Sequence, residues 1–326
     1  MAILRKINFP SIFSVDYAPI AKRFILVTNR LVVVDIDIMT KKYLRLPASN
    51  INEVLISKDE KRFVLKNTSG RIFIMCLNEG IVLLDLKNGR EGEGGNFVNS
   101  PCGNFFIYST WDGEIISRNW QTGAVMNKIE YPECLISHTS ISDDGILCFD
   151  IQPKLKLGEK YLGDSFLVYS KSSDRNFDDI VEYRFANFRS SKSIISPCGK
   201  YLAVLGCTRS DFKDCFRVYN LNENSLLIEE SAERGSSVSW SNCGRFVAFH
   251  SDEKMSIRAV PNFKEIKSVK CPGPTIFFMP QEIPWILIGG DYEAQLLSCD
   301  EFFSERFLGL PFPSWWEHIK SLRITN

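Results

Sequence analysis

Five short stretches of this chain share one pattern and recur at a nearly constant spacing. Each begins with a serine, ends with glycine or glutamate, and lies between two apolar runs. They occupy residues 57–60, 100–103, 142–145, 196–199 and 241–244. Their serines lie 43, 42, 54 and 45 residues apart, which is typical of a repeat array and not of a single enzyme domain. We therefore expect the chain to be built from similar small units.

The chemistry of these stretches predicts a β-turn in each unit. Serine starts the turn by bonding its own backbone, proline presets φ at the next position, and glycine closes it. One strand is predicted before each turn and three after it, for example at 104–109, 114–120 and 124–130. Four antiparallel strands in about 40–45 residues is the pattern of a β-propeller blade.

Two flanking segments fit the same unit without its serine, with Ala18-Pro19 and Met279-Pro280 in the turn. The prediction is therefore an all-β, single-domain, seven-bladed β-propeller of four-stranded antiparallel blades over residues 1–326. The expected blades span about 11–47, 51–87, 95–130, 134–186, 191–231, 235–270 and 273–310. The last blade is expected to take its fourth strand from 302–308, and the spare strand at 2–8 could also add to it.

A short C-terminal helix is predicted at 314–323. Ser314 and Glu317 form a capping box, and Trp315, Ile319 and Leu322 then fall on one helical face. This face is expected to pack against the propeller itself, and docking of a partner is the alternative.

The segment 113–123 reads Gly-Glu-Ile-Ile-Ser-Arg-Asn-Trp-Gln-Thr-Gly. It resembles the third strand and following turn of the WD40-like β-propeller superfamily, and the segments 83–89 and 216–221 have a similar pattern. The chain is divergent from that family, because the usual Gly-His and Trp-Asp pairs are missing and the hydrogen-bonded tetrad they form is not expected. The resemblance implies that the loops joining second to third strands, and fourth strands to the next blade, open on one face around a central channel. That face is the family's usual docking surface.

Composition narrows the range of partners. Lys+Arg and Asp+Glu number 39 each, so no global field favours nucleic acid or an acidic membrane. No run approaches 18 apolar residues, and the first 15 residues do not resemble a signal peptide. Of the ten cysteines, Cys102, Cys198 and Cys243 recur in equivalent turns, which are too far apart to be bridged. We expect reduced cysteines and a cytoplasmic location.

Motifs for catalysis and cofactors are missing from the sequence. There is no Gly-x-Ser-x-Gly elbow, Cys-x-x-Cys, His-Glu-x-x-His or Walker loop. Asp174, Asn176 and Asp178 alternate like calcium ligands, but Asp179 and Phe185 stand where that loop needs glycine and glutamate. The chain is expected to hold no metal or cofactor, and no small-molecule ligand.

Aromatic and charged residues in the loops of the predicted docking face are the candidate partner contacts, because aromatics and arginine dominate binding hot spots. The candidates are Trp111, Asp112, Lys154, Lys156, Tyr161, Phe188, Arg189, Arg209, Asp211, Phe212 and Asp252. The alternative for Trp111 and Phe212 is that their side chains fold back and cover blade edges. For the insertion at 152–163, the alternatives are a hairpin that reaches an acidic partner and an ordinary long hairpin.

The expected function is non-catalytic protein binding, as a scaffold subunit or a stoichiometric, immunity-type inhibitor of another protein. The alternative is a propeller hydrolase or lyase with its active site at the channel mouth. In that alternative Asp112, Arg209, Asp211 and Asp252 would converge there.

Overall fold

The computed structural model describes residues 3–8, 11–35, 40–86, 95–154, 165–172, 177–185, 188–208, 210–233, 236–251, 253–271, 273, 275–278, 285–289 and 293–298. Within these ranges the regular elements are all β-strands. The predicted all-β class with four-stranded antiparallel blades in a propeller arrangement is confirmed. The predicted helix at 314–323 and the predicted strand at 302–308 lie outside the described residues.

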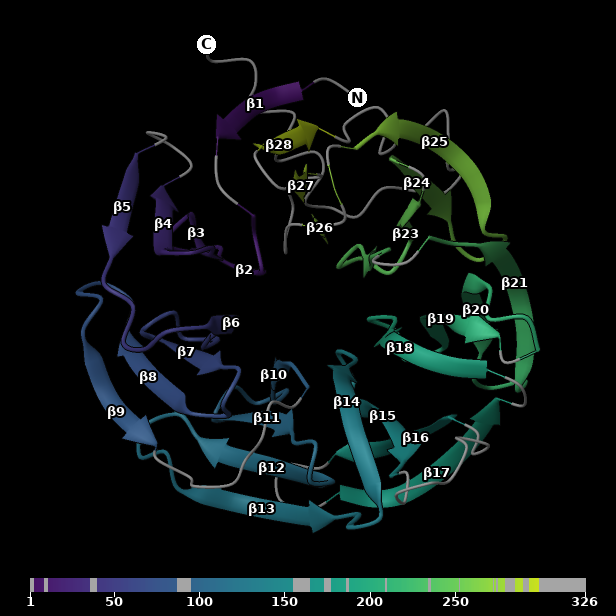
Figure 1. The fold of residues 1–326 in the computed structure, drawn as a ribbon, viewed down its shortest axis with the longest axis horizontal. Helices are drawn as coiled ribbons and strands as arrows, with labels where there is room; N and C mark the ends of the chain where they lie inside the picture. Colours follow the sequence, from purple (N-terminus) through teal and green to yellow (C-terminus); the bar gives the residue numbers. More distant parts are fainter. Residues whose placement is uncertain are drawn as a thin grey trace.

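The strands of the described residues form seven four-stranded antiparallel sheets around a central axis (Figure 1). The first three contain β2 (Ser14–Ala18), β3 (Arg23–Val27), β4 (Leu31–Asp35) and β5 (Lys41–Leu44); β6 (Ile51–Ile56), β7 (Arg62–Asn67), β8 (Ile72–Cys76) and β9 (Val82–Leu86); and β10 (Phe97–Asn99), β11 (Phe105–Ser109), β12 (Glu114–Asn119) and β13 (Val125–Glu130).

The next three sheets follow the same order along the chain. They contain β14 (Cys134–Ile141), β15 (Ile146–Pro153), β16 (Ser165–Ser172) and β17 (Phe177–Phe185); β18 (Phe188–Ile195), β19 (Tyr201–Thr208), β20 (Asp214–Asn220) and β21 (Ser225–Ser231); and β22 (Val238–Trp240), β23 (Phe246–Ser251), β24 (Lys254–Ala259) and β25 (Lys264–Lys270). The first strand of each sheet is nearest the axis and the fourth lies on the circumference.

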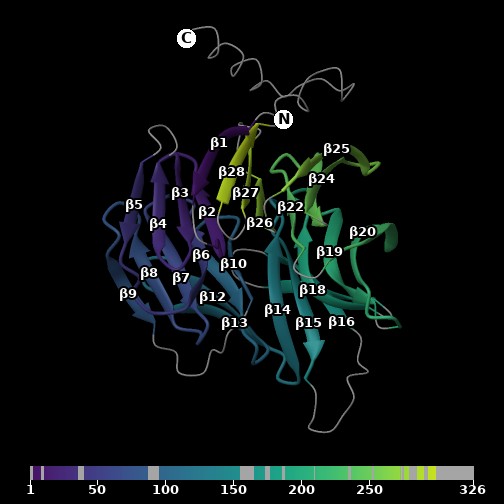
Figure 2. The ribbon, with the colours of Figure 1, turned by 45° about the horizontal axis from the view of Figure 1, so that its top comes forward.

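The last sheet joins the two ends of the chain. It contains β26 (Thr275–Phe278), β27 (Trp285–Gly289), β28 (Glu293–Ser298) and, on its outer edge, β1 (Ile3–Asn8). β1 runs antiparallel to β28, with Ile7 opposite Ala294 and Asn8 opposite Glu293 (Figure 2). The N-terminal strand therefore occupies the edge of β28 where the sequence predicted 302–308.

The predicted turns form in the way their residues suggest. The amide of Ser100 donates to the carbonyl oxygen of Phe105 at 3.0 Å, and the amide of Gly103 donates back to the Ser100 carbonyl at 3.0 Å. Gly103 has a φ of 74°, a conformation that glycine adopts without steric cost. In the first serine turn Glu60 takes this place with a φ of 52°, and its carboxylate accepts hydrogen bonds from the amides of Ile20 and Ala21 in the preceding sheet.

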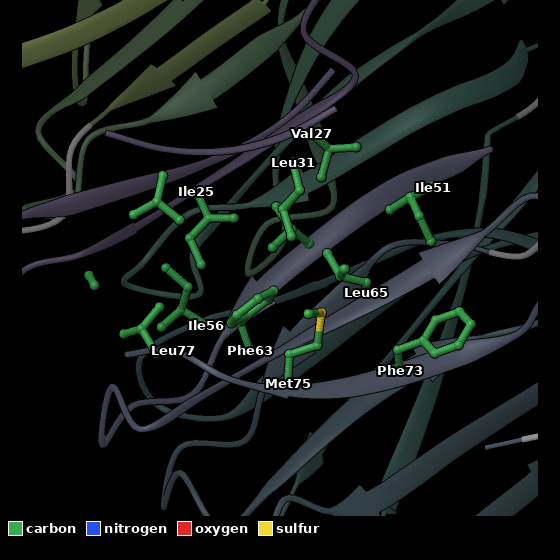
Figure 3. Packing of buried hydrophobic residues seen from close by; sticks show 13 residues of the cluster. Ile25, Val27, Leu31, Ile51, Ile56, Phe63, Leu65, Phe73, Met75 and Leu77 are labelled. Carbon is green, nitrogen blue, oxygen red and sulfur yellow. The ribbon is translucent and has the colours of Figure 1, made fainter. Parts of the chain in front are cut away.

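The hydrophobic core lies between neighbouring sheets and not in one central mass. Between the first two sheets, Ile25 and Leu31 of the first sheet pack against Phe63, Leu65 and Met75 of the second (Figure 3). All five side chains are fully or nearly fully buried. Burial of such a side chain contributes roughly 1.5–3 kcal/mol. Each sheet thus needs its two neighbours to shield both apolar faces.

Hydrogen bonds between innermost strands connect neighbouring sheets. The amide of Ile56 in β6 donates to the Asp16 carboxylate of β2 at 2.6 Å, and its carbonyl oxygen accepts from the Asn99 side chain of β10 at 2.7 Å. The same arrangement recurs where the amide of Ile195 in β18 donates to the Ser140 hydroxyl of β14 at 3.0 Å. These bonds connect neighbouring sheets near the axis.

Candidate functional site

Trp111 lies in the tight turn between β11 and β12 and is 45% exposed. Two hydrogen bonds between Thr110 and Glu114 close the turn: the amide of Thr110 donates to the Glu114 carbonyl oxygen at 2.9 Å, and the amide of Glu114 donates to the Thr110 hydroxyl at 3.2 Å. Gly113 has a φ of 86°, and the amide of Tyr131 donates to its carbonyl oxygen at 2.7 Å. The backbone therefore holds the indole at a fixed position on the surface.

Phe212 occupies the equivalent turn between β19 and β20 and is 79% exposed. Its φ is 53°, a left-handed conformation that costs a non-glycine residue about 1–3 kcal/mol. The turn is held by Asp211, whose carboxylate accepts a hydrogen bond from the Thr208 hydroxyl and forms an ion pair with Lys213 at 3.0 Å. These two contacts lower the pKa of Asp211 to about 2. A strained backbone thus presents an apolar ring to solvent.

The two aromatic side chains border the same groove on the predicted docking face. The groove has a volume of about 750 Å³ and extends across three neighbouring sheets. Trp111 lines it from the third sheet and Phe212 from the fifth, while Arg189 and Gln152 line it between them. Of the predicted contact residues, the structure therefore brings Trp111, Arg189 and Phe212 together.

Lys154 has a structural role that the sequence did not reveal. Its ammonium group donates to the carbonyl oxygens of Asp112 at 3.1 Å and Pro132 at 2.9 Å. It therefore connects the end of β15 to the turn that carries Trp111. We expected this lysine to contact an acidic partner, but two of its three donor hydrogens are directed at the protein's own backbone.

The prediction that Phe188 contacts a partner is wrong. We expected a loop at 187–189, but β18 begins at Phe188, and the ring is fully buried among Leu202, Val204 and Tyr219. The Arg217 guanidinium lies 4.2 Å from the ring centroid and covers it further. The adjacent Arg189 points the other way, since side chains alternate along a strand, and it is exposed.

The remaining predicted contacts do not gather at the groove. Asp112 and Asp211 are exposed on the two turns beside the aromatic residues and do not line the groove in the described part of the chain. Lys156, Tyr161, Arg209 and Asp252 lie outside the described residues. The predicted calcium-like residues Asp174 and Asn176 also lie outside them, and the described ranges contain no cluster of three His, Cys, Asp or Glu side chains suited to a metal ion.

A ring of polar residues around the axis was not recognised in the sequence. Every sheet places a polar residue four positions before its turn residue, within the innermost strand or directly before it. We call this set the polar belt: Ser14, Glu53, Asn96, His138, Lys192, Ser237 and Thr275. The signal is visible in the repeat alignment, because the same offset from each turn serine gives Glu53, Asn96, His138, Lys192 and Ser237.

Each of the three ionisable belt residues follows a β-bulge. One extra residue is inserted before Glu53 in β6, before His138 in β14 and before Lys192 in β18. A bulge bends its strand and re-aims the next side chain. Bulges at equivalent positions in three sheets therefore place these side chains at one level around the axis.

The electrostatics of these side chains show that they converge. Burial raises the pKa of Glu53, while Lys66 and Lys192 lower it. Burial lowers the pKa of Lys192, and Glu53 opposes that shift. Burial also lowers the pKa of His138 to about 3, with smaller contributions from Lys192 and Lys66. Together with the equivalent bulges, this mutual influence indicates that side chains of the second, fourth and fifth sheets point toward the common axis.

The comparisons with known proteins extend to the fold alone. No family model matches this sequence, and no curated protein matches it. In the described part of the chain no helix is long and apolar enough to pass through a bilayer. Among solved structures, Kuenenia stuttgartiensis hydrazine synthase superposes with a TM-score of 0.73 at 9% sequence identity, over 90% of this chain and 97% of that chain. This likeness and the ring of four-stranded sheets together identify the fold as a β-propeller.

Proposed function

We propose that this β-propeller acts by binding another protein through the groove between Trp111 and Phe212. The observation that carries the proposal is the exposure of two large aromatic side chains, 45% and 79%, at one groove on turns fixed by hydrogen bonds. Exposing the Phe212 ring to water on a strained turn costs free energy, and covering the ring in a complex would offset that cost. Aromatic anchors of this kind typically contribute 2 kcal/mol or more to binding.

The groove suits a partner that is recognised locally. Its turns are already ordered, so association loses little loop entropy. Arg189, Asp214 and Glu233 distribute both signs of charge along it, and the chain as a whole has a formal net charge of zero. Complementarity at short range, and not long-range steering, would therefore set the specificity.

Within this class we propose a seven-bladed, WD40-like scaffold subunit or stoichiometric inhibitor of the immunity type. The nine cysteines in the described ranges are all free thiols, which supports a reducing compartment such as the cytoplasm. The enzymatic alternative stays a prediction.

The test compares the full chain with the double variant Trp111→Ala/Phe212→Ala. The wild-type chain is purified with its partner under native conditions, the partner is identified by mass spectrometry, and the affinity of the purified pair is measured by calorimetry. Loss of both anchors should weaken binding at least about 100-fold and shift thermal unfolding by only a few degrees. Tyr43→Ala is the matched control, because Tyr43 is 56% exposed on the outer strand β5, away from the groove.

Two results would overturn the proposal. In one, the double variant binds the partner as tightly as both the wild type and the Tyr43→Ala control. In the other, the double variant unfolds at a much lower temperature than the control, which would show that the two rings stabilise the fold itself.

A further inference from the structure

The polar belt contains charged groups that the fold does not use. Within the described residues, the Lys192 ammonium and the His138 imidazole make no hydrogen bond and no ion pair within 4 Å, although both are largely shielded from solvent. Desolvating an ammonium group is costly unless it gains a partner. Ser14, Asn96 and Ser237 occupy the equivalent position in other sheets, so the fold itself does not require a charged residue there.

Lys192 and Glu53 are held apart across the axis. They belong to β18 and β6, which are innermost strands of sheets three places apart in the ring. They interact electrostatically, yet they do not form an ion pair. The Glu53 carboxylate instead accepts a hydrogen bond from the Ser14 hydroxyl at 3.4 Å. The ammonium group and the carboxylate therefore approach the axis from different sides without contacting each other.

The belt and the adjacent Lys66 together carry more positive than negative charge. Lys66 is almost fully buried beside Glu53, and its ammonium group donates to the Gly95 carbonyl oxygen and lies 5.2 Å from the Phe97 ring centroid. Because Lys66 and Lys192 face the single carboxylate of Glu53, and the low pKa of His138 keeps that ring neutral, the net charge favours an anion.

The groove extends to the residues directly before His138 and Lys192. Ser137 and Ser191 are the extra residues of the bulges that precede His138 and Lys192, and both line the groove. The Ser137 hydroxyl is buried without a hydrogen-bond partner in the described structure. Unsatisfied buried hydroxyls are uncommon in native proteins and usually mark a ligand or ordered water.

From these contacts we propose that the polar belt binds a small carboxylic acid that also carries a hydrogen-bond donor, such as an α-hydroxy or α-amino acid. Lys192 binds the carboxylate, Glu53 accepts the hydrogen bond from the hydroxyl or ammonium group, and His138 and Ser137 supply neutral hydrogen bonds between them. The site adjoins the groove through Ser137, but the proposal does not depend on the protein-binding function.

The test uses the purified full chain without any partner protein. Glycolate, glycine, acetate and methylammonium are titrated, and the ring signals of His138 are followed by NMR. The chain has three histidines, so a His138→Gln variant assigns those signals. Glycolate and glycine should shift the His138 signals with saturation, acetate should bind more weakly because it lacks the donor, and methylammonium should have no effect.

Two variants locate the ligand on the belt. Lys192→Met keeps the length of the side chain and removes its charge, so we expect a folded protein whose affinity for glycolate falls at least tenfold. Lys213→Met, in the exposed Phe212 turn, is the matched control and should bind as the wild type does. The proposal is overturned if no carboxylate shifts the His138 signals at millimolar concentration. It is also overturned if folded Lys192→Met binds glycolate as tightly as Lys213→Met does.

Discussion

The ammonium group of Lys154 donates a hydrogen bond to the carbonyl oxygen of Asp112, 3.1 Å away in the neighbouring sheet. This bond holds the turn that presents Trp111. Lys154→Met should therefore loosen the turn and speed amide hydrogen exchange in residues 110–114, since hydrogen bonds to charged groups contribute about 1.5–3 kcal/mol. Hydrogen exchange followed by mass spectrometry measures this. Lys213→Met should leave that segment unchanged, and equal exchange in both variants would contradict the role assigned to Lys154.

Gly113 and Gly244 provide a matched pair for the cost of close packing. Both have positive φ, 86° and 66°. A Cβ on Gly113 would lie 2.0 Å from the Tyr131 carbonyl oxygen, whereas a Cβ on Gly244 would meet nothing closer than 3.9 Å. Gly244→Ala should lower the free energy of unfolding by about 1–2 kcal/mol, the cost of the left-handed backbone. Gly113→Ala should lower it by at least about 2 kcal/mol more, because backbone atoms must also move. Urea denaturation measures both, and equal losses would show that the Tyr131 contact relaxes freely.

Asp150 makes stability depend on pH in an unusual direction. Its side chain is fully buried, and its carboxylate accepts a hydrogen bond from the Ser190 hydroxyl at 2.5 Å. Burial raises its pKa to about 7, although the hydrogen bonds from serine hydroxyls oppose the shift. An unfolded aspartate titrates near 4, so between about pH 4 and pH 7 the folded state binds more protons. The stabilising contribution of the protonated form is present below pH 4 and is lost as the pH rises through 7.

Asp150→Asn should remove this loss. Between pH 4 and 7, the free energy of unfolding of the variant relative to the wild type should rise by up to about 1.4 kcal/mol per pH unit. Asp16 and His138, whose pKa values are also shifted, are present in both proteins and cancel in the difference. Asp112→Asn, at an exposed position, is the control. Chemical denaturation at a series of pH values tests this, and parallel curves for Asp150→Asn and the wild type would contradict it.

The pairing of β1 with β28 predicts that the outer strand of the last sheet matters more than other outer strands. Proline at Lys6 in β1 or at Lys42 in β5 removes a backbone donor from an outermost strand in either case. Among the described strands, β1 alone pairs with a sheet whose other strands come from the opposite end of the described chain. Lys6→Pro should therefore lower the thermal unfolding temperature clearly more than Lys42→Pro in calorimetry. An equal or larger effect of Lys42→Pro would show that β1 does not lock the ring.

The repeated turns could be predicted from the sequence because their chemistry is local. Serine, proline and glycine each impose a backbone geometry that does not depend on the rest of the fold. The choice between residues 3–8 and 302–308 as partner of β28 could not be made in this way, because both segments have strand-forming residues and the pairing is decided by contacts across the whole chain.

The candidate site was predictable in part for the same reason. Trp111 and Phe212 were identified because each interrupts a polar turn. The end of the strand before Phe188 was placed correctly, but Phe188 itself was assigned to a loop. The reason is that the bulge in β18 lengthens β18 and leaves no local signature in the sequence. The polar belt was missed although its spacing was present, because a lone Glu53 or Lys192 resembles a surface residue until three sheets bring such residues to one axis.

The order in which the strands are made has a consequence for folding in the cell. β1 is synthesised before the other strands described here, but Asn8 finds its partner only when Glu293 has been synthesised. At 5–20 residues per second this delay amounts to roughly 15 s to a minute. During that time the nascent chain carries an open strand edge, which is a site for mispairing with other chains, so chaperone protection of the emerging polypeptide would have its greatest effect before the last sheet is complete.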